Sequence, residues 1–327
     1  MTPAVTACLV GDLGGTHTRL AIAELSQGSI TLTAKAIYLN RDAVSLEALI
    51  QDFLDTHQVQ TIPSHACLAI AGPVEGPRAR LTNLDWQLDS GLLQQTFGFR
   101  YATLINDFVA VAQGIDQVPP EAKVFLQARS ALPHTPRLVL GPGTGLGVAQ
   151  CLWTENRYRP LASEGGHIAF APMDDEQASL LAYLRAKQER VSVERILSGP
   201  GIADLYAFQL AAAGCPDQAD RSPAEISRAA LAGTDPQASQ ALRLFARILG
   251  QTAGDLALVS LARGGVFIAG GIPAKILPVL EREDFLVGFT RKGRFSDWVE
   301  QVPVCILTDP DLGLRGAAVA CFEAQQG

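Results

Sequence analysis

The chain has 327 residues, of which 48% are hydrophobic and 18% are charged, and its formal net charge is −7 at pH 7. This composition is too apolar for a disordered chain, and the length suits two domains that each bury a core. The negative charge balance argues against a nucleic-acid or anionic-membrane partner, because no basic stripe is present to neutralise phosphates.

The cysteines and the N-terminal segment bear on the cellular location. Six cysteines lie at residues 8, 67, 151, 215, 305 and 321, too far apart in sequence for a CxxC metal or redox pair. We expect reduced, mostly buried thiols, as in a cytoplasmic protein. The first residues lack the basic and apolar regions of a signal peptide, and no apolar run is long enough to cross a bilayer. The sequence therefore predicts a cytoplasmic location and no membrane partner.

Short β-rich runs and helical spacing alternate along the chain. Apolar residues recur with helical spacing from Leu46 to Leu54, and Ser45 is placed to cap this helix. Further helices are predicted at 176–189 and 238–262, and strands at 5–10, 20–25, 30–39, 66–71, 102–106, 137–140, 148–153, 265–269 and 304–307. This alternation predicts the α/β class.

Two glycine-rich turns resemble each other. VGDLGGT at 10–16 and LGPGTG at 140–145 each follow an apolar strand, contain a threonine and lead into a second apolar strand. Glycine lets the backbone approach a ligand closely, and successive N–H groups in such turns suit phosphate oxygens. The phosphate interpretation uses Gly14, Gly15 and Thr16 in the first turn, and Gly143 and Thr144 in the second.

Asp12 is the unexpected member of the first turn, because a carboxylate repels phosphate unless a cation lies between them. A Mg²⁺ ion that keeps several waters resolves this conflict. The alternative is that both turns are ordinary hairpins in which Asp12 accepts local N–H groups. Other phosphate motifs fail: no GxxxxGK[ST] run exists, and Leu146 occupies the third glycine position of a GxGxxG fingerprint.

A third glycine pair, Gly270-Gly271, ends an apolar strand and precedes Ile272-Pro273. Paired glycines at this junction permit the flat approach of an adenosine, and a simple strand-to-helix turn explains them equally well.

Candidate acid–base residues follow other strands. Asn106 and Asp107 stand between a predicted strand and a predicted helix. At this position Asp107 is suited to orient and deprotonate a substrate hydroxyl. The alternative is that one of the two residues caps the helix. Glu164 and His167 flank two glycines and suit a polyhydroxylated ligand. Zinc is set aside because no third ligand stands at a recognisable spacing. Glu194 precedes a glycine-rich turn, and alone it is typical of a helix surface.

Taken together, these stretches resemble the bacterial ATP-dependent glucokinase family, hexokinase relatives within the actin-like ATPase superfamily. Eight ordered motifs carry the resemblance over nearly the whole chain: GDLGGTHTRLAIAEL at 11–25, LAIAGPV at 68–74, TNLDW at 82–86, INDFVAVAQGI at 105–115, GPGTGLGVA at 141–149, EGGHIAFAP at 164–172, ERILSGPGIADLY at 194–206 and GGVFIAGGI at 264–272.

The resemblance implies transfer of the ATP γ-phosphoryl group to the 6-hydroxyl of D-glucose, with Mg²⁺. It implies a two-lobed, ribonuclease H-like fold with mixed sheets flanked by helices and a central cleft. The small domain would comprise 1–107 plus about 312–327, and the large domain 108–311. A C-terminal helix at roughly 313–323 would return to the small domain, and the protein would form a homodimer.

The resemblance also assigns roles. Asp107 resembles the catalytic base, and the sugar hydroxyls would be bound by Asn106, Asp107, Glu164, His167 and Glu194. The phosphates would be bound by Asp12, through Mg²⁺ and water, and by Gly14, Gly15, Thr16, Gly143 and Thr144. The adenosine would lie at Gly270 and Gly271.

Two residues depart from the family pattern. His17 replaces the Asn of many relatives, and Pro142 replaces a more usual Ala and removes one N–H from the second turn. The cysteine cluster of the related repressor and open-reading-frame kinase group is missing, which removes a structural zinc. Two alternatives stay open. The first is a kinase for another hexose or an amino sugar. The second is a non-catalytic sugar-binding regulator, and the negative charge and the absence of an added DNA-binding segment argue against it.

Overall fold

The structure is a computed structural model that describes residues 6–81, 86–215 and 220–324. Some predicted features lie outside the described residues: Thr82–Asp85 of the TNLDW motif, residue 5 of the first predicted strand, and residues 1–5 and 325–327 of the predicted small domain. The chain divides into two compact units, one formed by residues up to 120 and from 309 onward, the other by residues 121–308. We call them unit 1 and unit 2, and the domain limits given above stay a prediction.

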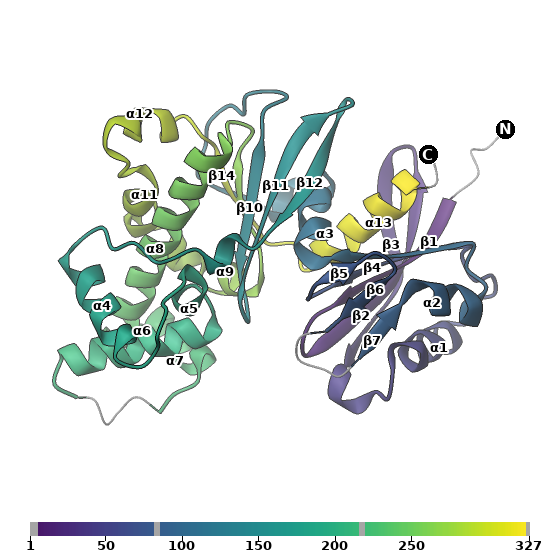
Figure 1. Cartoon of the computed structure of the whole chain (residues 1–327), viewed down its shortest axis with the longest axis horizontal. Coiled ribbons are helices and arrows are strands. Elements are labelled where there is room, and N and C mark those ends of the chain that lie inside the picture. Colours follow the sequence, from purple (N-terminus) through teal and green to yellow (C-terminus); the bar gives the residue numbers. More distant parts are fainter. Residues whose placement is uncertain (1–5, 82–85, 216–219, 325–327) are drawn as a thin grey trace. The chain divides into compact units, whose positions relative to one another are not determined.

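Unit 1 is built on a five-stranded sheet with the strand order β3-β2-β1-β4-β8. A separate three-stranded sheet has the order β5-β6-β7. Figure 1 shows the elements of this unit, whose bounds are β1 Thr6–Leu13, β2 His17–Ser26, β3 Ser29–Leu39, α1 Leu46–Thr56, β4 His65–Ile70, β5 Val74–Glu75, β6 Arg78–Arg80, β7 Gln87–Asp89, α2 Ser90–Phe97, β8 Tyr101–Asn106, α3 Asp107–Gly114 and α13 Leu312–Ala324.

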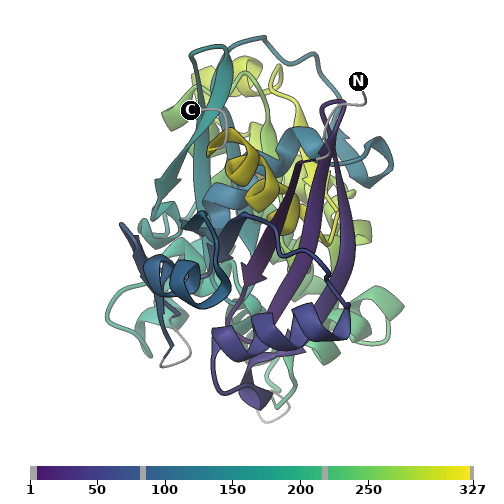
Figure 2. The ribbon, with the colours of Figure 1, turned by 90° about the vertical axis from the view of Figure 1, so that its right-hand side faces the viewer.

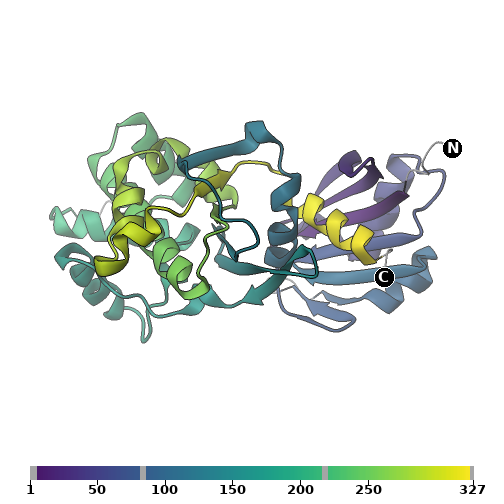
Figure 3. The same cartoon turned by 90° about the horizontal axis from the view of Figure 1, so that it is seen from above.

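Strand alternation gives the large sheet of unit 1 two buried faces. Leu9 and Leu13 of β1 pack with residues of α1 and α2 on one face. Figure 2 shows α1, the purple-blue helix, in front of the strands of this sheet. Cys8 and Val10 point the other way and pack with residues of α13. Figure 3, which views that second face, shows α13 in yellow beside α3. Asp12 has the parity of Cys8 and Val10, so its side chain lies on the α13 face.

Unit 2 contains a six-stranded sheet with the order β12-β11-β10-β13-β14-β9. Its elements have the bounds β9 Lys123–Gln127, β10 Arg137–Pro142, β11 Leu146–Thr154, β12 Arg157–Ser163, α4 Asp175–Arg185, α5 Val193–Ile196, α6 Gly199–Ala212, α7 Pro223–Ala232, α8 Pro236–Ser260, β13 Val266–Ile268, α9 Gly271–Lys275, α10 Leu277–Leu280, α11 Glu283–Thr290, α12 Ser296–Val299 and β14 Val304–Leu307.

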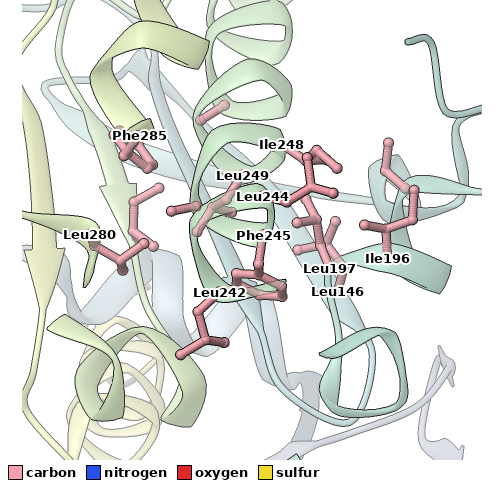
Figure 4. Packing of buried hydrophobic residues seen from close by; sticks show 14 of the residues in the cluster. Leu146, Ile196, Leu197, Leu242, Leu244, Phe245, Ile248, Leu249, Leu280 and Phe285 are labelled. Atoms are coloured by element: carbon pink, nitrogen blue, oxygen red, sulfur yellow. The ribbon is translucent and has the colours of Figure 1, made fainter. Parts of the chain in front are cut away.

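The long helix α8 forms the centre of the core of unit 2. Leu242, Phe245 and Leu249 of α8 are fully buried, with Leu280 and Phe285 packed beside them in Figure 4. Helix α11 crosses α8 at very short range, because a Cβ added at Gly250 would overlap the carbonyl of Phe285 and one added at Gly288 would overlap the carbonyl of Arg247. Glycine at both positions permits this backbone contact.

The two large sheets share one topology. In unit 1, β1 pairs antiparallel with β2 and parallel with β4, and β4 is parallel to β8. In unit 2, β10 pairs antiparallel with β11 and parallel with β13, and β13 is parallel to β14. Strand β9 is an additional antiparallel edge strand in unit 2. The similarity of the two glycine turns in the sequence is therefore matched by equivalent hairpins, and the predicted α/β class is confirmed.

Most elements predicted from the sequence are present, with shifted ends. Ser45 caps α1 by accepting a hydrogen bond from the N–H of Ala48, as expected. The predicted helix at 176–189 ends earlier, as α4 at Arg185, and the one at 238–262 is α8. The glycine-rich segment at 199–201 is the first turn of α6 rather than an isolated turn, because Ser198 caps it and Pro200 occupies a position that favours helix starts.

Candidate functional site

The first glycine turn lies at the carboxyl edge of the sheet of unit 1. Leu13 at the end of β1 pairs with Ile70 of β4, and Ile70 pairs with Asn106 of β8, so the three parallel strands end together. The carboxyl ends of parallel strands are where α/β folds commonly place ligands. The first glycine turn and the Asn106-Asp107 pair are thus brought to one edge of the sheet.

The turn itself comprises residues 14–16, and Asp12 stands on β1 before it. The N–H of Gly14 donates to the carbonyl of His17 (2.9 Å), which closes the hairpin. Asn40 supports it from the end of β3, since its side-chain amide donates to the carbonyl of Gly14 (2.8 Å) and its oxygen accepts from the hydroxyl of Thr18 (2.8 Å). The sequence interpretation missed Asn40, whose only signal was a polar residue directly after an alternating strand.

Asp12 is held between a cation and a helix start. Arg19 lies opposite Asp12 in the β1–β2 register, and its Nη1 is 3.6 Å from the Asp12 Oδ2. The same Nη1 donates to the carbonyl of Pro310 (2.7 Å), just before α13. Burial raises the pKa of Asp12 above its usual value, Arg19 lowers it, and Asp311 raises it further. The carboxylate therefore has one close cationic partner.

Asn106 and Asp107 both accept backbone N–H groups at the start of α3. Asn106 is the N-cap, because its Oδ1 accepts from the N–H groups of Phe108 (3.0 Å) and Val109 (3.2 Å). The Oδ1 of Asp107 accepts from the N–H of Phe108 (2.9 Å). Burial raises the pKa of Asp107 to about 6, the Phe108 N–H opposes this shift, and the charge of Asp12 adds to it. A carboxylate with this pKa is suited to accept a proton near neutral pH.

The second glycine turn has the corresponding position in unit 2. Pro142 ends β10 and pairs with Leu146 at the start of β11, so the turn comprises residues 143–145. The N–H of Gly143 donates to the carbonyl of Gly145 (2.8 Å), and the carbonyl of Gly143 accepts from the N–H of Gly199 at the start of α6 (2.8 Å). Pro142 is a strand residue, so the N–H groups available for a ligand come from the residues after it.

Glu164, His167 and Glu194 are brought together in unit 2. The His167 Nε2 lies 3.9 Å from the Glu164 Oε2 and 3.9 Å from the Glu194 Oε1. Glu164 is 91% exposed and His167 57%, whereas Glu194 is 28% exposed. The turn Gly165–His167 can lie against β11 because residue 166 has no Cβ, which would overlap the carbonyl of Leu146. Two carboxylates beside one imidazole suit a ligand with several hydroxyl groups.

Gly270 and Gly271 form the predicted strand-to-helix junction. Gly270 has φ +96°, and a Cβ there would lie 2.8 Å from the carbonyl of Pro142, so both backbone conformation and close approach require glycine. Helix α9 begins at Gly271 and borders a cavity of about 500 Å³. The cavity is lined by Gly199, Ile202, Pro223, Ala224, Ser227, Arg228, Leu231, Ile272, Lys275 and Ile276.

This cavity is mostly apolar and adjoins the second glycine turn through Gly199, which suits a flat heterocycle beside a phosphate site. The sequence interpretation missed its walls from α6 and α7. A larger cavity of about 630 Å³ lies in unit 1, lined by Pro73, Glu75, Arg78, Ala79, Arg80, Gln87, Leu88 and Asp89. It contains none of the predicted site residues, so its volume alone does not mark it as the functional site.

Within residues 6–81, 86–215 and 220–324, no three His, Cys, Asp or Glu side chains are grouped so that they could hold a metal ion. The single carboxylate of Asp12 fits a Mg²⁺ ion that takes its other ligands from water and phosphate. In the described part of the chain, no helix is both long and apolar enough to span a bilayer.

The sequence and the fold were compared with known proteins. The family model named Glucokinase matches residues 9–324. A glucokinase from Nostoc punctiforme is 41% identical over 338 residues, which cover 96% of this chain and 98% of that protein. The crystal structure of a glucokinase from an Antarctic psychrotroph is 35% identical, with a TM-score of 0.88 over 97% of this chain and 99% of the other.

A third likeness concerns the fold alone. The structure of a glucokinase from Balamuthia mandrillaris, solved in complex with glucose, is 24% identical, with a TM-score of 0.81 over 97% of this chain and 94% of that one. Together with the duplicated strand order, these likenesses confirm the predicted α/β fold of the actin-like ATPases.

Proposed function

The chain belongs to the glucokinase family, and from that premise we propose that it transfers the γ-phosphoryl group of ATP to the 6-hydroxyl of D-glucose, with Asp107 as the general base. The observation that carries the assignment of the base is the position and pKa of Asp107. It begins α3 at the carboxyl edge of a parallel sheet, and burial raises its pKa to about 6. A base of this strength is ionised at neutral pH and still accepts a proton readily.

The reaction forms one bond to phosphorus and breaks another, and one proton moves from the sugar hydroxyl to the base. The glucose O6 attacks the γ-phosphorus while its proton passes to a carboxylate oxygen of Asp107, and the bond between the γ-phosphorus and the bridging oxygen breaks to release ADP. Phosphoryl transfer needs little covalent help from the protein, so alignment and charge neutralisation provide most of the catalysis. Asn106 contributes by fixing the start of α3, from which Asp107 projects.

Several groups would bind the nucleotide. The N–H groups of Gly14 and Gly143 already bond within their hairpins, so the other N–H groups of the turns at 14–16 and 143–145 are the ones suited to phosphate oxygens. The hydroxyls of Thr16 and Thr144 would add two further donors. Mg²⁺, bound through water to Asp12, would neutralise phosphate charge. Arg19 keeps the Asp12 carboxylate in place beside that ion. The cavity beside Gly271 would take the adenosine, with Ile272 and Ile276 against the base.

Sugar recognition would rest on Glu164, His167 and Glu194, with Asn106 and Asp107. Carboxylates and an imidazole that lose water on binding require hydrogen-bond partners, and a missing sugar hydroxyl leaves one of them unpaired at a cost of about 1–3 kcal/mol. We therefore propose selection for the hydroxyl pattern of glucose over other hexoses. An amino sugar is the principal alternative, since its ammonium would also pair with the carboxylates of Glu164 and Glu194.

The test is a coupled ADP-release assay with ATP and Mg²⁺ against a panel of hexoses and amino sugars. We expect glucose to give the highest kcat/KM. Asp107→Asn should reduce kcat by at least a hundredfold while glucose still binds, as measured by calorimetry. The matched control is Asp55→Asn on the exposed face of α1, which should leave kcat unchanged. A faster reaction with mannose or glucosamine would refute the substrate, and an active Asp107→Asn variant would refute the base.

We also propose a cytoplasmic location and a homodimer. Five of the six cysteines are buried, which fits reduced thiols in a compartment where ATP is present. The homodimer rests on the family resemblance and is tested by light scattering coupled to gel filtration.

A further inference from the structure

The two carboxylate oxygens of Glu194 have different partners. Oε2 accepts a hydrogen bond from the backbone N–H of Leu146 (2.9 Å), the first residue after the second glycine turn. Oε1 faces the sugar-binding group, 3.9 Å from the Nε2 of His167. One side chain therefore bridges the turn proposed to hold phosphate and the cluster proposed to hold sugar, and all of these residues belong to unit 2.

Gly145 makes this bridge possible. A Cβ at Gly145 would lie 2.5 Å from the Glu194 Oε2 and 3.2 Å from its Cδ, which is closer than a carbon atom can approach without displacement. Gly145 does not have the positive φ that favours glycine at residue 270, so space for the carboxylate is the reason that the structure gives for glycine here. Any side chain at this position would push Glu194 off the Leu146 N–H.

Both ends of the bridge are fixed in the core. Leu146, Ile196 and Leu197 are buried in one hydrophobic cluster and lie on the same side of α8 in Figure 4. The N–H of Val193 donates to the carbonyl of Ile168 (3.0 Å), which ties the start of α5 to the segment after His167. The residue after the turn and the residues of α5 thus pack in one core, and the hydrogen bond from the Leu146 N–H joins the turn to Glu194.

We propose that the hydrogen bond between Leu146 and Glu194 couples the sugar and nucleotide sites, with Gly145 as the positioning residue that permits it. The inference rests on the proposed function. A phosphate bound by the turn orders the Leu146 N–H, and this N–H orders the carboxylate that the sugar requires. Each ligand then binds a site that the other has already ordered, which makes the coupling positive and reciprocal.

The test measures glucose affinity by calorimetry with and without the non-hydrolysable analogue AMPPNP and Mg²⁺. In the unaltered protein, AMPPNP should lower the Kd for glucose about fivefold or more. We call the Kd for glucose without AMPPNP divided by the Kd with AMPPNP the coupling ratio. Gly145→Ala should weaken glucose binding in the absence of nucleotide and reduce the coupling ratio at least threefold. Glu194→Asp, which keeps the charge but shortens the reach, should reduce the ratio as well, so the test does not depend on Gly145→Ala alone.

The matched control is Gly254→Ala on α8. Its Cβ would lie 2.5 Å from the Cε of Lys292 and 2.5 Å from the backbone carbonyl oxygen of Phe289, so the overlap is more severe than at Gly145 and lies outside the site. This variant should lower the melting temperature and leave the ratio unchanged. If the unaltered protein neither binds nor phosphorylates glucose, the proposed function fails. If it does both but shows no coupling, or if Gly145→Ala and Glu194→Asp keep the full ratio, only the coupling is refuted.

Discussion

The carboxylate of Asp12 lies directly against Gly313, in the first turn of α13. A Cβ at Gly313 would be 2.9 Å from both the Cγ and the Oδ2 of Asp12. Strand parity turns Asp12 toward α13, and the short glycine leaves room for its carboxylate at the start of that helix, where backbone N–H groups favour negative charge. The C-terminal helix therefore forms part of the proposed Mg²⁺ site.

Replacing Gly313 by alanine should displace the Asp12 carboxylate without unfolding the protein. The overlapping atoms belong to the free end of a side chain, and alanine favours a helix over glycine by about 1 kcal/mol. We expect a several-fold higher Mg²⁺ concentration at half-maximal rate and an almost unchanged melting temperature. Gly316→Ala is the contrasting variant, because its Cβ would overlap the backbone carbonyl of Ala110 and should destabilise the fold strongly. An unchanged Mg²⁺ dependence in Gly313→Ala would contradict the first expectation.

The pKa of Asp107 predicts the pH dependence of the reaction. A base with a pKa of about 6 must be ionised to act, so kcat/KM for glucose should rise with pH through about 6 and level off above about 7. The charge of Asp12 contributes to the raised pKa, so Asp12→Asn should move the midpoint to lower pH. The measurement is the pH profile of the initial rate at limiting glucose. A profile that stays flat between pH 5 and 8 would exclude Asp107 as the base.

The same ionisation makes Asp107 a source of instability at neutral pH. The pKa of Asp107 is raised in the folded state, so protonation of its carboxyl group stabilises the folded protein. This contribution to the free energy of unfolding is complete below about pH 3.8 and is lost as the pH rises through about 6. Asp107→Asn should therefore stabilise the protein by about 1–3 kcal/mol at pH 7 and by less at pH 5. Scanning calorimetry at both pH values measures this, and equal gains at both would contradict it.

A buried carboxylate on α11 of unit 2 pairs with two partly exposed arginines of α8. Asp284 on α11 is 4% exposed and bonds to the Nε of Arg243 (2.9 Å) and the Nη2 of Arg247 (3.1 Å). Asp284→Ala removes the charged hydrogen bonds to both guanidiniums, which stay accessible to water, and should reduce stability by about 1.5–3 kcal/mol. Glu176→Ala, which removes a more exposed partner of Arg247, should reduce it by about 1 kcal/mol or less. Urea unfolding measures both free energies. Equal losses in Asp284→Ala and Glu176→Ala would show that the burial of the carboxylate does not determine its contribution to stability.

Local patterns in the sequence predicted the parts of the fold that depend on neighbouring residues. The helix cap at Ser45, the glycine hairpins and the strand before Gly270 each follow from a short run of residues. The edge strand β12 was missed because its residues 157–163 are partly exposed and do not alternate cleanly between polar and apolar. Strand β9 was missed for a similar reason, since Phe125 faces outward.

The candidate residues were found from the sequence, but their contacts were not. Glu194 was taken only from the family resemblance, because its bond to Leu146 joins residues 48 positions apart. The contact of Asp12 with Gly313 joins the two ends of the chain, and the support of Gly14 by Asn40 depends on the pairing of β2 with β3. Such contacts form only when strands and helices from distant segments pack together, so local sequence patterns do not predict them.

The discontinuous core of unit 1 has a consequence for synthesis on the ribosome. Helix α13 covers the sheet face that carries Cys8, Val10 and Ala21, yet it is made last. At common translation rates, on the order of ten to forty seconds pass between the synthesis of this sheet and the synthesis of α13, and the apolar face is uncovered during that time. Unit 2 is synthesised in the same interval as one continuous segment. The later-made unit is thus able to fold first, and a chain that stops before residue 312 would leave its oldest strands open to aggregation and to capture by chaperones.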